Sequence, residues 1–283
     1  MATFDEAFKE GYEILSKFGI ENPGLDARLL LEKATDRDRG YILAHPEKSL
    51  SDEEYRDYME WINERALRKP LQHIVGTEGF MGLTFKVTKD VLIPRPDTEC
   101  LVEEVLKNMH DGMDILDMCT GSGCILISLL HYSNGCKGLG VDISKEALAI
   151  AKENAKQILA DKANISCEFA ESDMFDAVEG KYDIIVSNPP YIKTSDIAAL
   201  EPEVREFDPL SALDGGDDGL LFYRILAEKG NEYLKPFGLM AFEIGFDQSK
   251  EVEEILGSKG YRDIITIKDY AGNDRVVTAR KGL

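Results

Sequence analysis

A glycine-containing loop is the first segment of this 283-residue chain whose residue types suggest chemistry. The run DMCTGSG covers residues 117–123 and places Gly121 and Gly123 between an apolar stretch and a helical one. Glycines there permit a close backbone approach by a ligand, at a helix N-terminus whose free N–H groups favour negative charge. A dinucleotide-binding loop would need a third glycine where Leu126 stands, so a pyrophosphate cofactor is disfavoured.

Two carboxylates accompany this loop. Asp117 lies four residues before Gly121, and Asp142 falls at the end of the next apolar run. A carboxylate after the second strand can accept hydrogen bonds from both ribose hydroxyls, and one in the first loop can contact a cationic amine. A ribose and an ammonium group without a pyrophosphate describe S-adenosylmethionine, which is the cofactor we predict. Either acid taken alone is more simply a helix N-cap.

The second motif is Ser187-Asn188-Pro189-Pro190-Tyr191, which follows the apolar run YDIIV. The prolines stiffen the loop, Asn188 and Pro189 offer carbonyl acceptors, and Tyr191 offers a flat ring. Two acceptors and a ring match a planar NH₂ group, whose nitrogen is a poor nucleophile because its lone pair is delocalised. The acceptors would hold that nitrogen at the methyl sulfonium and favour the charge it gains. We nominate no general base.

The two motifs lie in loops between predicted strands and helices, and these elements must bring the loops together. Beyond residue 90, the alternation indicates an α/β protein with a parallel sheet covered on both faces, and the loops at the carboxyl ends of its strands share one crevice. The last two runs, on either side of Gly272-Asn273, predict an antiparallel hairpin at the sheet edge. The expected strands are 113–119, 137–143, 165–172, 182–190 and 239–245, and the expected helices begin at 124, 144, 217 and 248.

The first seventy residues have a helical period instead. Apolar residues recur every three or four positions from Phe4 to Phe18, a second helix follows Pro23, and a third begins at Ser51 with a capping box to Glu54. The glycines and alternating apolar residues of 73–90 predict a hairpin. The expected organisation is a helical domain at 1–72, a β-hairpin linker at 73–90 and a catalytic domain at 91–283.

Composition excludes several classes of protein. The formal net charge of −20 disfavours a nucleic-acid-coating protein, and no apolar run is long enough to span a membrane. The amino terminus lacks the features of an export signal, so we expect a cytoplasmic protein. The four histidines show no metal-ligand spacing and the five cysteines no CxxC pair, so we expect no metal and buried thiols.

The two motifs together resemble the release factor glutamine methyltransferases, the PrmC/HemK family of class I S-adenosylmethionine-dependent methyltransferases. PLQHIVG (70–76), LIPRPDTE (92–99) and FDPLSALDGGDDGLLFYR (207–224) extend the resemblance over essentially the whole chain. It implies a Rossmann-like, seven-stranded, mostly parallel sheet preceded by a small helical domain for substrate docking. It also implies N5 methylation of the glutamine in the Gly-Gly-Gln loop of class I peptide chain release factors, with S-adenosylhomocysteine as the second product.

The resemblance also assigns roles by position. Asn188 and Pro189 would receive the amide NH₂, Tyr191 would pack on its plane, and Arg95 to Glu99 would shape the pocket mouth, with Pro190 completing the substrate loop. Many relatives carry glycine at position 119 and an aromatic residue at position 174, so cofactor affinity is a separate question from cofactor identity. The implied cofactor contacts are Asp117, Cys119, Thr120, Gly121, Ser122, Gly123, Asp142, Asp173, Met174 and Asn188.

Two other functions stay open. A methyltransferase of an exocyclic amine of nucleic acid, such as adenine N6, could use the same Asn-Pro-Pro-Tyr loop, although the net charge and the absence of a target-reading domain disfavour it. The basic run of Arg65, Arg68 and Lys69 is more simply the charged end of a helix. A noncatalytic cofactor-binding protein would be expected to lose the acceptor loop, which is intact here. We expect a monomer whose partner is a release factor and neither nucleic acid nor membrane.

Overall fold

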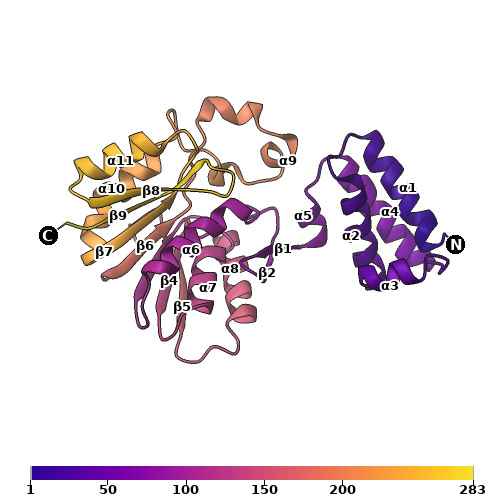
Figure 1. Cartoon of the computed structure of the whole chain (residues 1–283), viewed down its shortest axis with the longest axis horizontal. Coiled ribbons are helices and arrows are strands. Elements are labelled where there is room, and N and C mark those ends of the chain that lie inside the picture. The colour runs from indigo at the N-terminus through magenta and orange to yellow at the C-terminus, as the bar shows by residue number, and fades with distance from the viewer. Residues whose placement is uncertain (1, 283) are drawn as a thin grey trace. The chain divides into compact units, whose positions relative to one another are not determined.

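The computed structural model describes residues 2–282 and contains two compact units (Figure 1). The helical unit runs to Gly76 and also includes Glu201–Phe207, a segment that returns from the far half of the sequence. The sheet unit contains the other described residues. None of the described helices combines the length and the apolar character needed to cross a membrane.

The helical unit is built on three longer helices that contact one another. Thr3 and Ser51 each form a capping box with the glutamate three residues later, as the sequence predicts at Ser51. The two shortest early helices lie outside the predicted set because a helix of five or six residues leaves little periodicity to detect. The helices are α1 (Phe4–Lys17), α2 (Pro23–Thr35), α3 (Arg39–Ala44), α4 (Asp52–Ala66), α5 (Leu71–Val75) and α9 (Pro202–Arg205).

Ion pairs hold the returning segment to this unit. Arg65 Nε lies 2.7 Å from Asp26 Oδ2, and both side chains are nearly buried. Arg65 and Arg68 also approach Glu203 Oε1, at 3.3 and 3.1 Å. Lys69 pairs with Glu64 at 2.9 Å. Each cation of the basic run therefore faces a carboxylate of its own unit.

A seven-stranded, mostly parallel sheet forms the sheet unit, as predicted (Figure 1). The strand order is β5-β4-β3-β6-β7-β9-β8, and only β9 pairs antiparallel with its neighbours β7 and β8. The strands are β3 (Asp114–Met118), β4 (Lys137–Asp142), β5 (Ser166–Glu171), β6 (Tyr182–Ser187), β7 (Leu234–Glu243), β8 (Arg262–Lys268) and β9 (Asp274–Arg280).

Helices cover both faces of this sheet. One apolar core lies between the sheet and α6 (Glu99–Asn108), α7 (Cys124–His131) and α8 (Lys145–Ile158). The other lies under α10 (Leu221–Tyr233) and α11 (Ser249–Ser258). Both faces are apolar because parallel strands joined by helical crossovers are buried on both sides. The prediction of a doubly covered sheet is confirmed.

Local chemistry explains where the elements begin and end. The separate hairpin, β1 (Thr77–Phe80) and β2 (Leu83–Lys86), begins later than predicted because α5 occupies residues 71–75. Strand β6 ends at Ser187, before Pro189 and Pro190, which have no N–H to donate. The helix expected from 217 starts at Leu221, because the residues before it form turns. Gly272, at φ +87°, makes the predicted turn between β8 and β9.

Candidate functional site

A cavity of about 490 Å³ opens at the carboxyl ends of β3, β4 and β6, where the two sequence motifs lie. The glycine loop and the proline loop thus contribute to one site. Of the residues singled out from the sequence, those in the cavity wall are Cys119, Gly121, Asp142, Asp173, Met174, Asn188 and Pro190.

The glycine loop turns sharply after β3. The backbone has a left-handed conformation at three alternate positions, with φ angles of +58° at Cys119, +54° at Gly121 and +78° at Gly123. A Cβ on Gly121 would meet no atom within 4 Å, whereas a Cβ on Gly123 would lie 2.8 Å from Ile127 Cδ1. Gly121 therefore leaves space open at the cavity, and Gly123 permits close packing of α7. Cys119 adopts a conformation that glycine accepts more easily.

Asp142 links the loop to the next crossover. Its Oδ2 accepts from the backbone N–H of Gly121 and its Oδ1 from that of Ser144, each at 2.9 Å. Burial raises the pKa of Asp142, and these backbone N–H groups oppose the rise. Carboxylate oxygens have further lone pairs, and this side chain lines the cavity. It can therefore accept hydrogen bonds from a ligand while it stays fixed by the backbone.

Asp117 takes a different place from Asp142. It is fully buried and absent from the cavity wall, with Oδ2 accepting from the Thr120 hydroxyl at 2.6 Å. Its Oδ1 has no hydrogen-bond partner among the described residues. Burial raises its pKa to about 7. Thr120 and Ser122 are also buried, and they form the support of the loop while its ligand-facing surface comes from their neighbours.

The turn after β5 forms another part of the wall. The Ser172 hydroxyl donates to the carbonyl of Met174 at 2.6 Å and accepts from the N–H of Ala177 at 3.0 Å. Met174 has φ +48°, and the turn brings it and Asp173 to the cavity. A thioether thus lies where a planar ligand group could pack.

Several residues of the cavity wall are not predicted individually by the sequence motifs. Residues 90–92, Ile143 and 209–212 line the cavity, together with Phe222 at the start of α10. Most of these residues belong to the 207–224 motif, which the resemblance singles out. Their contact with the cavity depends on how this segment packs against loops that are distant in the sequence. Arg95 lies outside the wall and donates to Asp208 Oδ2 at 2.6 Å. It anchors the chain just before residues 209–212.

The proline loop is fastened by the segment that precedes α10. The N–H of Ile192 donates to the carbonyl of Leu213, and the N–H of Gly215 donates back to Ile192. The Gln248 side chain donates to the carbonyl of Tyr191 at 3.0 Å. At the start of the loop, the Ser187 hydroxyl donates to the carbonyl of Met118 at 2.7 Å. These hydrogen bonds therefore fix the backbone of the proline loop, which is the loop that carries the acceptors Asn188 and Pro189.

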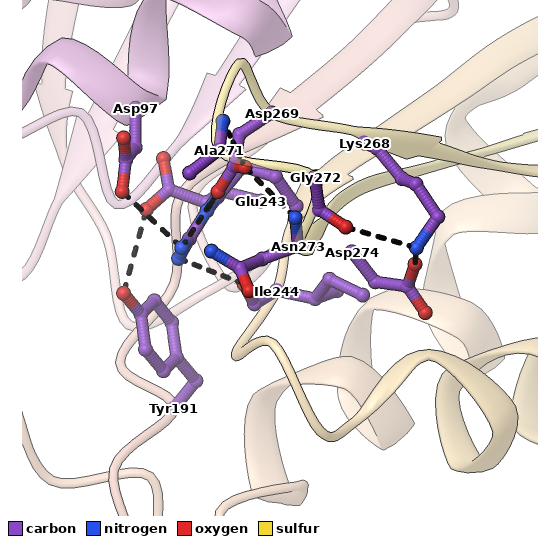
Figure 2. A network of polar contacts seen from close by, with 11 residues as sticks. Asp97, Tyr191, Glu243, Ile244, Lys268, Asp269, Ala271, Gly272, Asn273 and Asp274 are labelled. Carbon is purple, nitrogen blue, oxygen red and sulfur yellow. Dashed lines mark hydrogen bonds and ion pairs between the residues drawn. The ribbon is translucent and has the colours of Figure 1, made fainter.

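Side chains of the loop point in different directions. Asn188 reaches the cavity wall and donates from Nδ2 to Thr98 Oγ1 at 3.3 Å. Tyr191 and Pro189 are not in the wall. The Tyr191 ring packs against the core under α10, and its hydroxyl donates to Glu243 Oε1 at 3.4 Å (Figure 2). Burial raises the pKa of this tyrosine.

Comparisons with known proteins agree with this architecture. Family models match residues 6–76, as PrmC N-terminal domain, and residues 96–201, as methyltransferase small domain. A methyltransferase from Pyrococcus furiosus has a similar structure, with a TM-score of 0.52 and 21% identity over 72% of this chain and 91% of that one. At this identity the likeness concerns the fold.

Two full-length relatives are much closer in sequence. The release factor glutamine methyltransferase of Caulobacter vibrioides is 42% identical over 99% of this chain and 96% of the relative. That of Clostridium botulinum is 41% identical over 96% of this chain and 97% of the relative. Identity of this extent spans both the helical unit and the sheet unit. The chain belongs to the family of release factor glutamine methyltransferases.

Proposed function

We propose that this chain transfers a methyl group from S-adenosylmethionine to the side-chain amide nitrogen, N5, of the glutamine in the Gly-Gly-Gln motif of class I peptide chain release factors. The observation that carries this proposal is that Asp142 and the Asn188 loop line one cavity. Family relatives that match nearly the whole chain are release factor glutamine methyltransferases. Such an enzyme acts in the cytoplasm, where its substrate works.

The residues present fit S-adenosylmethionine. The Asp142 carboxylate suits the ribose hydroxyls, the open side of Gly121 admits the amino-acid part, and Met174 suits adenine. When Asp117 is ionised, its buried carboxylate adds negative potential beneath the loop, which favours a cationic ligand. When bound, the cofactor supplies a methyl group on a positively charged sulfur.

Methyl transfer to an amide depends on positioning. Asn188 Oδ1 and the carbonyl of Pro189 accept hydrogen bonds from the substrate NH₂ and hold its lone pair toward the methyl group. The same two acceptors stabilise the positive charge that the nitrogen gains. The surplus proton leaves to water afterwards, so no side chain is required as a base. The ring of Tyr191 closes the loop from beneath.

Transfer of labelled methyl to a purified release factor tests the proposed function. We expect label on the intact factor and none on a variant that lacks the loop glutamine or on DNA. Label on DNA alone would support the amino-adenine alternative. Label on neither, despite measured cofactor binding, would contradict the proposed substrate.

Replacement of Asp142 by alanine is expected to weaken S-adenosylmethionine binding at least tenfold, because a charged hydrogen-bonding partner of the ribose contributes roughly 1.5–3 kcal/mol. The Asp142→Asn variant keeps the shape and one acceptor, so it should show a smaller loss. Calorimetric titration measures both affinities, and circular dichroism checks the fold. Unchanged affinity in the alanine variant would remove Asp142 from the ribose site.

Raised salt is expected to weaken binding of the release factor. The chain has a net charge of −20, and a partner that binds ribosomal RNA is locally basic, so their attraction is screened by ions. The dissociation constant, measured by a surface-based or fluorescence titration, should rise steadily with ionic strength. Cofactor affinity serves as the internal comparison. A dissociation constant insensitive to salt would argue against an electrostatic contribution.

A further inference from the structure

Glu243 is a buried carboxylate behind the acceptor loop. It is the last residue of β7, and only 2% of its surface is exposed. Its neighbour Phe242 pairs with Ser187 across the two parallel strands, so Glu243 lies level with Asn188. Burying a carboxylate is costly unless hydrogen bonds or charges stabilise it. The hydrogen bonds and charges around Glu243 therefore determine its protonation state.

Three hydroxyls surround this glutamate. The Tyr191 hydroxyl donates to Oε1 at 3.4 Å, as Figure 2 shows, and the Tyr223 hydroxyl donates to the backbone carbonyl of Glu243 at 2.9 Å. Oε2 has no hydrogen-bond partner among the described residues. The Thr98 hydroxyl lowers the pKa of Glu243 and so favours the ionised carboxylate. The unpartnered Oε2 is an acceptor available to the Thr98 proton.

Thr98 also contacts the acceptor loop. Its Oγ1 accepts from Asn188 Nδ2 at 3.3 Å, and the residue is 2% exposed. A hydroxyl carries one proton, whereas an ionised carboxylate can only accept. When Glu243 is ionised, the Thr98 proton is drawn toward it, and the Thr98 oxygen is left to accept from Asn188. The donors then run in one direction, from Asn188 through Thr98 to Glu243.

We propose that Glu243 is a positioning residue that acts through Thr98 to fix the amide of Asn188 with Oδ1 toward the cavity. This inference rests on the proposed function, in which Oδ1 accepts from the NH₂ of the substrate. If the Asn188 amide were reversed, its own NH₂ would face that of the substrate. Two donors would then oppose each other, and the substrate nitrogen would lose its alignment.

The protonation state of Glu243 controls this arrangement. Burial raises its pKa to about 7, the Thr98 hydroxyl and the Arg275 guanidinium oppose the rise, and Asp97 adds to it. Arg275 is itself fixed by Asp97 and Asp269, at 3.2 and 3.1 Å. The groups around Glu243 come from the 3-10 turn Pro96–Thr98, from α7, α10 and β9, and from the loop after β6: Asp97, Cys124, Tyr223, Arg275 and Tyr191.

The sign of the pH effect follows from the donor chain. Above its pKa, Glu243 is ionised and can only accept, so Asn188 is held in the productive orientation. Below it, the protonated carboxyl can donate to Thr98, and the direction of the chain is no longer fixed. Turnover should therefore rise with pH around 7. Asp117 has a similar pKa, so variants must separate the two groups.

The first test does not depend on catalysis. The side-chain amide resonances of Asn188, assigned by their loss in Asn188→Ala, are followed across neutral pH in the isotope-labelled full chain. We expect a titration with a midpoint near 7 in the wild type and none in Glu243→Gln. A titration that persists in Glu243→Gln, or one that is absent from the wild type, would overturn the inference whether or not a release factor is the substrate.

The second test is a double-mutant cycle in kcat at saturating cofactor. Glu243→Met keeps the volume and removes the acceptor, and we expect about a tenfold fall in kcat with unchanged cofactor affinity. The same change in a Thr98→Val background should cause no further fall, because the connection is already broken. Thr98→Ser, which keeps the hydroxyl, should stay close to the wild type.

Two outcomes of the double-mutant cycle would contradict the proposed role of Glu243. Equal losses from Glu243→Met in both backgrounds would show a structural role for the glutamate without transmission through Thr98. Wild-type kcat in Glu243→Met would remove its role altogether. An inactive wild type would contradict the proposed function instead, and the resonance titration would still decide the orientation of Asn188.

Discussion

Replacement of Asn188 by alanine is expected to lower kcat for release factor methylation at least tenfold, an order-of-magnitude value for the loss of one oriented acceptor. The side chain lies in the cavity wall, and Thr98 holds its Nδ2, so Oδ1 remains for the substrate. Alanine also leaves the Thr98 hydroxyl without this donor. Single-turnover kinetics with labelled cofactor would measure the effect on transfer directly.

The fall should lie in kcat, because the acceptor is needed most as the nitrogen gains charge. Asn134→Ala is the matched control, since Asn134 is exposed and lies between α7 and the start of β4, away from the carboxyl ends of the strands. The thermal midpoint should change little in either variant, and Asn134→Ala should also keep the wild-type cofactor affinity. Wild-type turnover in Asn188→Ala would refute the assigned role of this loop.

Replacement of Gly219 by alanine should have a larger effect, about a hundredfold loss of kcat, because a displacement of roughly 1 Å at a reacting centre has this order of cost. Gly219 has φ +74°, and a Cβ there would lie 2.4 Å from the carbonyl oxygen of Tyr191 and 2.7 Å from Gln248 Nε2. The first contact is with backbone and cannot be relieved by a rotamer change. The acceptor loop must therefore shift.

Gly180→Ala separates this displacement from the general cost of a left-handed residue. Gly180 has φ +89°, but a Cβ there would meet nothing within 4 Å. Both variants should lose stability by roughly 1–3 kcal/mol through backbone strain, and only Gly219→Ala should lose turnover. Denaturant unfolding and steady-state kinetics measure the two effects. Equal turnover in the two variants would show that the loop tolerates the added atom.

Much of the fold follows from local sequence. The change from a helical period to alternating strand and helix predicts the amino-terminal helices and the parallel sheet with its closing hairpin. It does not predict that residues 201–207 join the helical unit. Periodicity reports which face of an element is apolar, which is a local property. It gives little signal in short elements, so α3 and α5 are not predicted, and the ten-residue α6 is not predicted either. The start of α10 is predicted too early because turns precede it.

The cavity likewise has one part that local sequence predicts and another part that depends on contacts between distant residues. Glycines and prolines reveal a sharp turn without reference to distant residues, and loops after parallel strands must meet at one sheet edge. The sequence therefore brought Asp142, Gly121 and Asn188 to one site, where the structure places them. It did not reveal that residues 209–212 complete the wall, because that contact depends on how a long return segment packs.

The sequence alone determined the family, the alternation of elements and the two loops, because these reside in residue types, short spacings and motif order. Only the tertiary structure decided which side chains reach the cavity. Asp117 is buried beneath its loop, Tyr191 turns to Glu243, and Asn188 meets Thr98 from 90 positions away. Contacts between residues so distant in the chain depend on the packing of the sheet and its helices, which no local pattern records.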